Sequence, residues 1–531
     1  MTVLRIQSFR RAALLDVILV SLLITYFLHF ALLSLPAHFR GDDLMNMHYY
    51  WSAGAWKAVR ANLFFWTWFE RPLPAFYYLP LHHFFDLNPR PYRIVTISLV
   101  GATIPIAYLL ARSLGASRSV AFLAIFAWCY HPALASLVFI DAFIYDVLCT
   151  LFYLTALAWY VAIRETDRLL SPLELLGCFV AYLCALNSKE MAVTLPVMAL
   201  IYELLKYYHG PSRKNFFQWI WQSASPALVA GLIAAIYCYA KMYGPDGLYV
   251  HSEGREGYMP HYSWHAFGRA NANFISQLFY LGPHQWIPVR LVFAAWGLVF
   301  LYAFLRRDRM VELMAFWVVI TPLPLAFIVP IRGEASLVIP FFGWAMIFAK
   351  LVSDLIEMVC RSSIVTEQRY VLGAFIGAIV LGAGSGYAAA ALIGALAGAV
   401  AVKLPSARFP AIAFVVLVFG LAIHNEQQNH RWARYLLRAG EKEAHLISAF
   451  RALDLRPKPA SKILLTDNPL AGAPWGEEWA TLFIPKLLWN DHSLTIWLER
   501  PDHTLNDQER AGMDYILAVH EFNVDVIRQP R

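Results

Sequence analysis

The chain has 531 residues, of which 59% are hydrophobic and only 15% are charged. Soluble globular proteins carry about 45–50% apolar and about 25% charged residues, so this composition excludes an ordinary cytosolic enzyme. The abundance of apolar residues also excludes intrinsic disorder. In a membrane protein, a net charge of +7 indicates basic cytoplasmic loops and is no evidence of an acidic partner.

The first long apolar run covers residues 12–35 and predicts an uncleaved membrane span, because it is too long for a signal peptide. Arginines at positions 5, 10 and 11 precede it and place the N-terminus in the cytoplasm. Further runs predict spans at about 92–111, 119–138, 143–163, 173–187, 191–207, 222–240, 288–305, 310–329, 336–352 and 409–424. Basic loops recur on the cytoplasmic side of these spans, which accounts for the positive charge.

A region rich in Gly and Ala, 371–402, decides the total number of crossings. Two short spans there give about thirteen crossings and an extracytoplasmic tail, whereas one long span puts the tail in the cytoplasm. We prefer two spans. The predicted fold is therefore an all-α polytopic membrane protein with about 11–13 transmembrane helices and a small soluble α/β appendage. We expect it in the plasma membrane, taken as a bacterial inner membrane.

The predicted organisation is a transmembrane domain over 1–424 and a soluble, extracytoplasmic domain over 425–531. Two long loops lie on the outside. The loop 36–91 is rich in Trp, which favours helices lying in the membrane interface, and the loop 241–287 is expected to cover a substrate. In the tail, a helix is predicted at about 430–453 and strands at 462–466 and 493–498.

Carboxylates cluster near the outer ends of the spans, where charge is costly unless it is used. Asp42 and Asp43 follow the first span and suit a general base, or ligands for a hard divalent cation. Asp141 and Asp146 lie at the outer junction of the spans 119–138 and 143–163. A solvated loop start is the alternative for the first pair, and helix capping is the alternative for the second.

Three cations also lie outside, against the positive-inside bias: Arg71, Lys189 and Arg332. Glu190 and Glu334 could supply partners for the last two locally, and this is the structural interpretation. The functional interpretation is that the cations bind a phosphate or pyrophosphate head group at the outer leaflet. No nucleotide-binding motif is present, and the cytoplasmic loops account for the basic balance, so nucleic acid has no support.

Several segments together resemble the GT-C membrane glycosyltransferases, and within them the protein O-mannosyltransferase branch with its tetratricopeptide-bearing relatives. The resemblance extends over about residues 10–350. The matching segments, in chain order, are Gly41-Asp42-Asp43, Arg71-Pro72-Leu73, Leu87-Asn88-Pro89 with Tyr92-Arg93, His131-Pro132 with Asp146, Ser188-Lys189-Glu190 through Pro196, and Arg332 with Ser336 to Pro340. The chain departs from the family pattern at Leu134 and Ser136, at Arg93, where the family usually has His, and at 336–340, where the aromatic residues are missing; no tetratricopeptide repeats follow.

The resemblance implies a hexosyltransferase that uses a polyprenyl-phosphate-linked sugar and a protein, lipid or glycan acceptor at the outer face, in protein glycosylation or cell-envelope synthesis. It implies a direct, inverting displacement with Asp42 or Asp43 as base. Asp146 would orient the acceptor or share a divalent cation, Mg²⁺ or Mn²⁺, with Asp43. The expected substrate-binding residues are Arg71, His131, Asp141, Lys189, Glu190 and Arg332.

Other functions remain open at this stage. A transporter or flippase for lipid-linked sugars would also need charges near spans, but it predicts internal inverted repeats and charges near the bilayer midplane. A polymerase or ligase of surface polysaccharide would still be a glycosyltransferase, with a lipid-linked acceptor. A purely structural or binding role would leave the outer charges without a task.

Overall fold

The computed structural model describes most of residues 2–529. The stretches outside the description are 65–70, 211–214, 246, 251–256, 258, 279, 281–286, 329–332, 361–366, parts of 369–408, 471–477 and 501–503. Arg332 and most of the region 371–402 therefore lie outside the described residues, as do the parts 246, 251–256, 258, 279 and 281–286 of the predicted lid 241–287.

The described part of the chain contains nine helices long and apolar enough to cross a membrane, or ten if a pair bent by 55° is one span. The main helices are α1 (Thr2–Ala31), α5 (Pro89–Ser113), α8 (Ile144–Arg164), α10 (Leu195–His209), α12 (Ser225–Tyr243), α14 (Val289–Arg306), α15 (Arg309–Ile320), α17 (Val338–Cys360) and α20 (Phe409–Arg438). The bent pair joins α6 (Arg118–Cys129) to the segment Pro132–Phe139, and α9 (Pro172–Ser188) is a shorter apolar helix. These helices coincide with every predicted span outside 371–402, which confirms the polytopic helical fold.

Local sequence signals set the helix boundaries. Asn88 caps α5 by accepting a hydrogen bond from the Arg90 amide, and Pro89 occupies the first helical position. Ser171 begins α9 with a capping box that Glu174 completes. The bend after α6 falls at His131-Pro132, because the residue before a proline is pushed out of the helical conformation.

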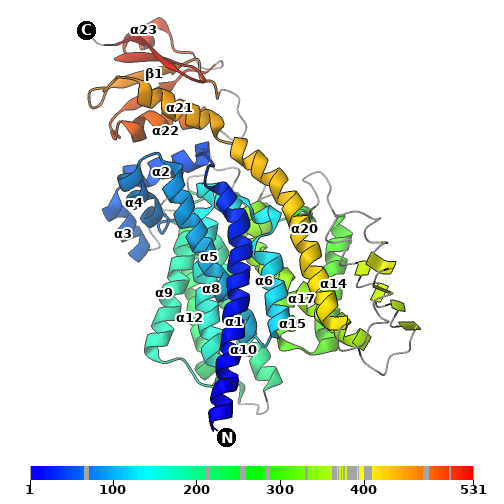
Figure 1. Ribbon diagram of the computed structural model, residues 1–531. Coiled ribbons are helices and arrows are strands. Elements are labelled where there is room, and N and C mark those ends of the chain that lie inside the picture. The colour runs from blue at the N-terminus through cyan, green and yellow to red at the C-terminus, as the bar shows by residue number, and fades with distance from the viewer. Residues whose placement is uncertain are drawn as a thin grey trace.

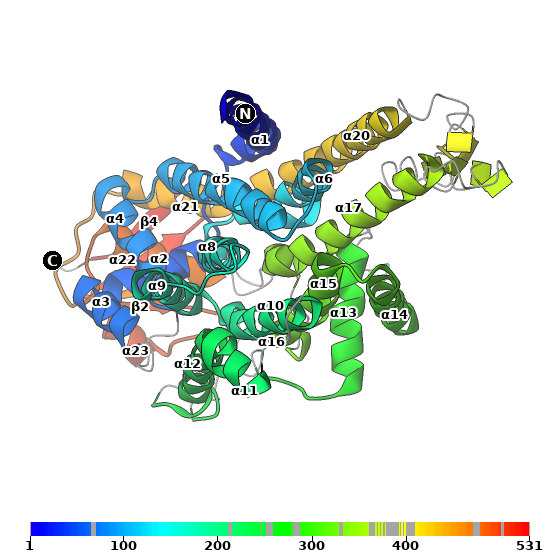
Figure 2. The ribbon, with the colours of Figure 1, turned by 90° about the horizontal axis from the view of Figure 1, so that it is seen from below.

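Three short helices gather at the upper end of the bundle as drawn in Figure 1: α2 (Gly41–Ala53), α3 (Ala55–Leu63) and α4 (Ala75–Phe85). They come from the predicted outer loop 36–91. Seen from below, α1 stands at the edge of the bundle (Figure 2). The second predicted loop, 241–287, holds the helix α13 (Trp264–Leu278), which packs against α14 and α16 (Leu323–Ala326).

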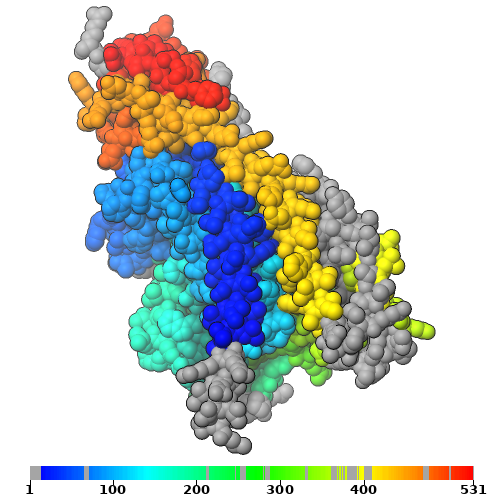
Figure 3. All heavy atoms as spheres, viewed as in Figure 1, coloured from blue at the N-terminus to red at the C-terminus, as the bar shows by residue number. Residues whose placement is uncertain are grey.

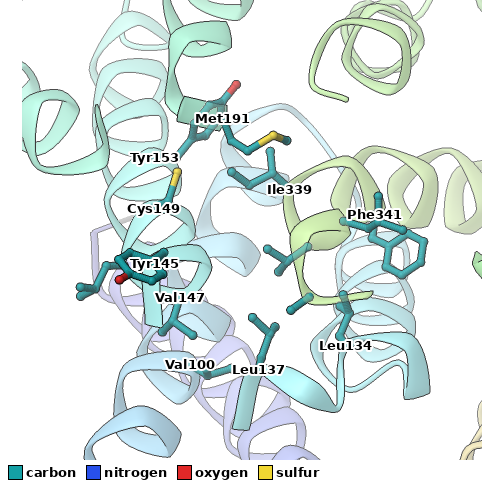
Figure 4. Close-up of a cluster of buried hydrophobic side chains, with 14 of the residues drawn as sticks. Val100, Leu134, Leu137, Tyr145, Val147, Cys149, Tyr153, Met191, Ile339 and Phe341 are labelled. Atoms are coloured by element: carbon teal, nitrogen blue, oxygen red, sulfur yellow. The ribbon is translucent and has the colours of Figure 1, made fainter. Parts of the chain in front are cut away.

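The core lies where α8 meets α17 and a set of short turns. Val147, Cys149 and Tyr153 of α8 face Met191 of η4 (Glu190–Thr194) and Ile339 of α17 (Figure 4). All five side chains are buried. Burial of this apolar surface against neighbouring helices holds these turns in place, and the turns carry most of the predicted site residues.

The C-terminal part is a small mixed sheet with the strand order β2-β1-β3-β4. The strands are β1 (Lys462–Thr466), β2 (Thr495–Leu498), β3 (Tyr515–Val519) and β4 (Val524–Arg528), and the helices are α21 (Glu441–Ala452), α22 (Ala480–Leu488) and α23 (Asp507–Ala511). β1 is parallel to β2 and β3, while β4 is antiparallel to β3. The predicted strands 462–466 and 493–498 are found, whereas β3 and β4 were not predicted.

The C-terminal part sits directly on the upper helices (Figures 1 and 3). The Trp51 indole N–H donates to the Asn490 amide oxygen at 3.1 Å, and Arg451 pairs with Asp86 at 3.0 Å. Gly440, with a φ of +89°, lets the turn after α20 approach the Phe39 carbonyl more closely than a side chain would permit. The tail therefore lies at the same end as the 36–91 segment, which requires an odd number of crossings.

Candidate functional site

A fully buried arginine joins three elements at the upper end of the bundle. Arg93, one turn into α5, places Nη1 2.9 Å from Asp141 Oδ1 and Nη2 3.9 Å from Asp43 Oδ2. Its Nη2 also donates to the His38 carbonyl at 3.0 Å. All three charged side chains are 0% exposed. The guanidinium thus holds two carboxylates that would otherwise repel each other without water between them.

Asp43 fixes the start of α2 against the turn η3 (Asp141–Phe143). Its Oδ2 accepts the Arg40 amide at 2.9 Å, and its Oδ1 accepts the Ala142 amide at 2.6 Å. Burial, and then the charge of Asp141, raise the pKa of Asp43 to about 6, although Arg93 and the two amides act in the opposite direction. Both oxygens of Asp43 are therefore engaged within the protein.

Asp42 has a different environment from its neighbour. It is the second residue of α2, and its side chain is exposed at the upper end of the bundle. The first turn of a helix favours a negative charge, because unpaired backbone amides point toward it. The acidic pair is thus divided into one buried and one accessible carboxylate.

A second ion pair lies beside this group. Arg71 donates from Nε and Nη2 to the two carboxylate oxygens of Glu190, at 3.1 and 3.0 Å. The Arg71 guanidinium also lies over the Tyr145 ring, 5.0 Å from its centroid. The Tyr50 hydroxyl of α2 donates to the Arg71 carbonyl at 2.7 Å, which ties α2 to the segment that carries Arg71. Both members of the pair are partly exposed, so a ligand can reach them.

A third pair is almost fully buried between α8 and the turn before α17. Lys189 Nζ donates to Asp146 Oδ1 at 2.6 Å and to the Ser336 hydroxyl at 3.0 Å. Lys189 lies between α9 and η4, and its extended backbone ends the first helix before the second begins. Asp146 follows Tyr145 directly in the chain, and the Tyr145 ring lies against the Arg71 guanidinium. The Lys189–Asp146 pair is therefore connected to the Arg71–Glu190 pair through two consecutive residues of α8.

The partners of Lys189 and Glu190 differ from the local pair considered in the sequence. Lys189 pairs with Asp146, and Glu190 pairs with Arg71. The interpretation that Glu190 serves Lys189 is therefore wrong, because the backbone turn at 189–190 sends the two side chains to different neighbours. Helix capping does not describe Asp141 and Asp146 either, since each carboxylate binds a cation.

The residues do not fit a shared divalent cation. Asp43 and Asp146 are bonded to different cations, and the described residues hold no group of three or more His, Cys, Asp or Glu that could bind a metal ion. His131 lies apart from the ion pairs, with Nδ1 accepting the Ala133 amide and Nε2 3.3 Å from the Leu278 carbonyl.

Sequence reasoning quoted Arg93 within the family resemblance but gave this central residue no role in the site, and it missed the tyrosines around it. The Tyr77 hydroxyl donates to Asp141 Oδ1 at 2.8 Å, and the Tyr78 hydroxyl donates to the Asp141 carbonyl at 3.0 Å. The available signal for Arg93 was a charge inside the predicted span 92–111, a position where charge is costly. For the tyrosines no signal stood out, since aromatic residues are frequent throughout 36–91.

Comparison with solved structures finds a similar fold in ArnT from Cupriavidus metallidurans bound to undecaprenyl phosphate. The TM-score is 0.50 at 13% sequence identity, over 90% of this chain and 85% of ArnT. The apo form of ArnT gives a TM-score of 0.47 at 13% identity, over 94% of this chain and 88% of that chain.

The archaeal oligosaccharyltransferase AglB from Archaeoglobus fulgidus, in complex with an inhibitory peptide and a dolichol-phosphate, gives 0.47 at 10% identity, over 93% of this chain and 69% of AglB. No family model and no curated protein sequence matches the chain. The chain therefore has a fold similar to that of ArnT, and the comparisons do not single out the O-mannosyltransferase branch.

The buried Arg93 predicts a large stability effect. Arg93→Leu leaves two carboxylates buried without their cation, so we expect a loss of about 3–5 kcal/mol in unfolding free energy, measured by thermal unfolding in detergent. Arg168→Leu is the control, because Arg168 pairs with Glu174 at the surface and its loss should change little. Equal stability of the two variants would contradict the assigned role of Arg93.

The raised pKa of Asp43 predicts a pH dependence. The folded protein holds this proton up to about pH 6, whereas the unfolded chain releases it near its ordinary value of 3.8. The contribution of Asp43 to stability is therefore full below about pH 4 and is lost as the pH rises through 6. Asp43→Asn should remove this loss. The melting temperature of the variant minus that of the wild type should therefore increase as the pH is raised from 4.5 to 7.5. Parallel curves for the two proteins would refute the shift.

Proposed function

We propose that the protein is a membrane glycosyltransferase that moves a sugar from a polyprenyl-phosphate donor to an acceptor hydroxyl at the extracytoplasmic face. The observation that carries the proposal is the clustering of Asp42 and Asp43 with Arg71 and Lys189 at one end of a bundle whose fold is similar to that of ArnT. ArnT, whose fold is similar, was solved with undecaprenyl phosphate bound. That ligand has the phosphate and polyprenyl parts that the proposed donor needs.

The two aspartates have different roles in this proposal. Asp42 is the general base, because its carboxylate is exposed and can meet a substrate. Asp43 is a positioning residue, because both of its oxygens hold backbone amides. It anchors the first turn of α2 to Ala142, and this fixes the direction in which Asp42 projects.

The chemical step is an inverting displacement. Asp42 accepts the proton of the acceptor hydroxyl, and the freed oxygen lone pair attacks the anomeric carbon of the donor sugar. The bond between that carbon and the phosphate oxygen breaks, and the lipid phosphate leaves with the bonding electrons. Positive groups near the leaving phosphate lower the barrier, because negative charge develops there in the transition state.

Arg71 is the proposed phosphate ligand among the described cations. Its guanidinium is partly exposed, and its partner Glu190 is partly exposed as well. A phosphate can join or replace that carboxylate with the same bidentate geometry. Arg332 is proposed as a second ligand on sequence grounds alone. Lys189 and Asp146 are more deeply placed, and we assign them to shaping the floor of the site.

The transporter alternative receives less support. It calls for charged groups near the bilayer midplane. Here Asp43, Asp141, Asp146 and Glu190 all gather at one end of the bundle around the start of α2 and η4. Incubation of membranes with a radiolabelled polyprenyl-phosphate sugar separates the two functions, because only an enzyme moves the label from the lipid to an acceptor.

The assigned base predicts a specific loss of transfer. Asp42→Asn should reduce the rate of transfer by about 10²–10⁴-fold while leaving the melting temperature near that of the wild type. Asp86→Asn is the matched control, since Asp86 is a half-exposed carboxylate at the same end of the bundle. Full activity of Asp42→Asn in the radiolabel assay would overturn the assignment of the base.

The assigned phosphate ligand predicts a change in donor use. Arg71→Ala should raise the KM for the lipid-linked donor by about tenfold or more, because a bidentate charged contact is lost. The KM for the acceptor should stay unchanged. Arg451→Ala, which removes an exposed arginine paired with Asp86, is the control and should leave both constants near the wild-type values. An unchanged donor KM in Arg71→Ala would exclude the phosphate role.

A further inference from the structure

The backbone around Arg71 is fixed by contacts that do not involve its ion pair with Glu190. The Tyr50 hydroxyl donates to the Arg71 carbonyl at 2.7 Å. Two residues further on, the Leu73 amide donates to the Asn187 carbonyl at 3.1 Å, and Asn187 precedes Glu190 by three residues. These two bonds hold the base of the Arg71 side chain whether or not the ion pair is formed.

The charged end of the Arg71 side chain rests on an aromatic ring. Its guanidinium carbon lies 5.0 Å from the centroid of the Tyr145 ring, which is within the range of a cation–π contact. Tyr145 is the second residue of α8, is 8% exposed, and belongs to the buried cluster drawn in Figure 4. The ring therefore gives the guanidinium a fixed support that is separate from Glu190.

Tyr50 connects this support to the helix that carries the proposed base. It lies on α2, eight residues after Asp42, and is 1% exposed. Its hydroxyl also lies 3.2 Å from the Tyr145 hydroxyl. The Tyr50 ring stacks on Tyr78 of α4, with 5.5 Å between centroids and 15° between planes. Packing thus fixes the ring of Tyr50, and the fixed ring sets the place of the hydroxyl that binds Arg71.

Binding of a phosphate makes a particular demand on Arg71. In the proposed function the donor phosphate joins or replaces the Glu190 carboxylate, so the anion that orients the guanidinium changes when the donor binds. A long side chain that has to be reordered at that moment weakens binding, because its lost rotamer freedom is subtracted from the affinity. A ring that supports the face of the guanidinium avoids this loss, since it leaves the N–H groups at the edge directed at the anion.

We infer that Tyr145 and Tyr50 are positioning residues for the donor phosphate. The Tyr145 ring supports the Arg71 guanidinium and the Tyr50 hydroxyl holds the Arg71 backbone, so the cation stays in place while its anionic partner is exchanged. The inference rests on the proposed function and deepens it, because both tyrosines act through Arg71 and not on a reacting atom. Through Tyr50, the helix α2 positions the phosphate ligand as well as the proposed base, Asp42.

The role of the ring is tested by binding of undecaprenyl phosphate to the full-length protein in detergent, a measurement that needs no transfer. Tyr145→Leu should raise the Kd by about fivefold, because the cation–π contact is lost. Tyr145→Phe keeps the ring and should stay within about twofold of the wild type. Undecaprenol, which lacks the phosphate, should bind the three proteins equally. An unchanged Kd for undecaprenyl phosphate in Tyr145→Leu, an equal rise in Tyr145→Phe, or a parallel rise for undecaprenol would overturn this role.

The role of the Tyr50 hydroxyl is tested by an isosteric change. Tyr50→Phe should raise the Kd for undecaprenyl phosphate by about threefold or more, since it removes the bond to the Arg71 carbonyl and keeps the stacked ring. Tyr160→Phe is the matched control, because Tyr160 is a buried residue of α8 whose hydroxyl donates to Glu203 at 2.8 Å. This control should lower the melting temperature and leave the Kd unchanged. Equal Kd values in Tyr50→Phe and Tyr160→Phe would overturn the role of the hydroxyl.

A double-mutant cycle separates positioning from a general structural effect. Because Tyr145 acts through Arg71 in the inference, the double variant Arg71→Ala/Tyr145→Leu should bind undecaprenyl phosphate no more weakly than Arg71→Ala alone. Additive losses would overturn the inference and leave the phosphate role of Arg71 intact. An unchanged Kd in Arg71→Ala, or no binding to the wild type, would instead overturn the proposed phosphate ligand together with the inference.

Discussion

The upper end of the molecule depends on one buried guanidinium. Arg93 compensates Asp141 directly and Asp43 at longer range, and it does so with all three side chains withdrawn from water. The interaction ties α5 to the start of α2 and to η3, which come from three separate parts of the chain. Two carboxylates in this position would repel each other without the cation. The arrangement therefore fixes where the accessible Asp42 projects, and the proposed chemistry follows from that direction.

The two other ion pairs at this end are more exposed to solvent than the group around Arg93. Lys189 with Asp146 is nearly buried, whereas Arg71 with Glu190 remains partly open. A buried pair resists substitution by a ligand because separating it leaves an uncompensated charge. An open pair can exchange its partner for a phosphate at less cost. In the proposed function, this gradient of burial separates the groups that support the site from the group that binds the donor phosphate.

The C-terminal sheet and α20 enclose the upper end of the bundle, as drawn in Figure 1. Trp51 of α2 and Asp86 at the end of α4 contact the C-terminal part, so α2, which carries Asp42, and α4 are covered from above. α20 connects this cover to the bundle and packs against the segment Pro132–Phe139.

The sequence by itself determined the membrane class, the spans outside 371–402 and the gathering of unusual charges at one face. These properties are local, since hydropathy and basic loops are read within a window of about 20 residues. The partners of those charges were decided only by tertiary structure. Glu190 stands next to Lys189 in the chain yet binds Arg71, and Arg93 meets Asp43 across 50 residues. Such pairings depend on how helices pack and where turns aim side chains, and neither composition nor spacing contains that information.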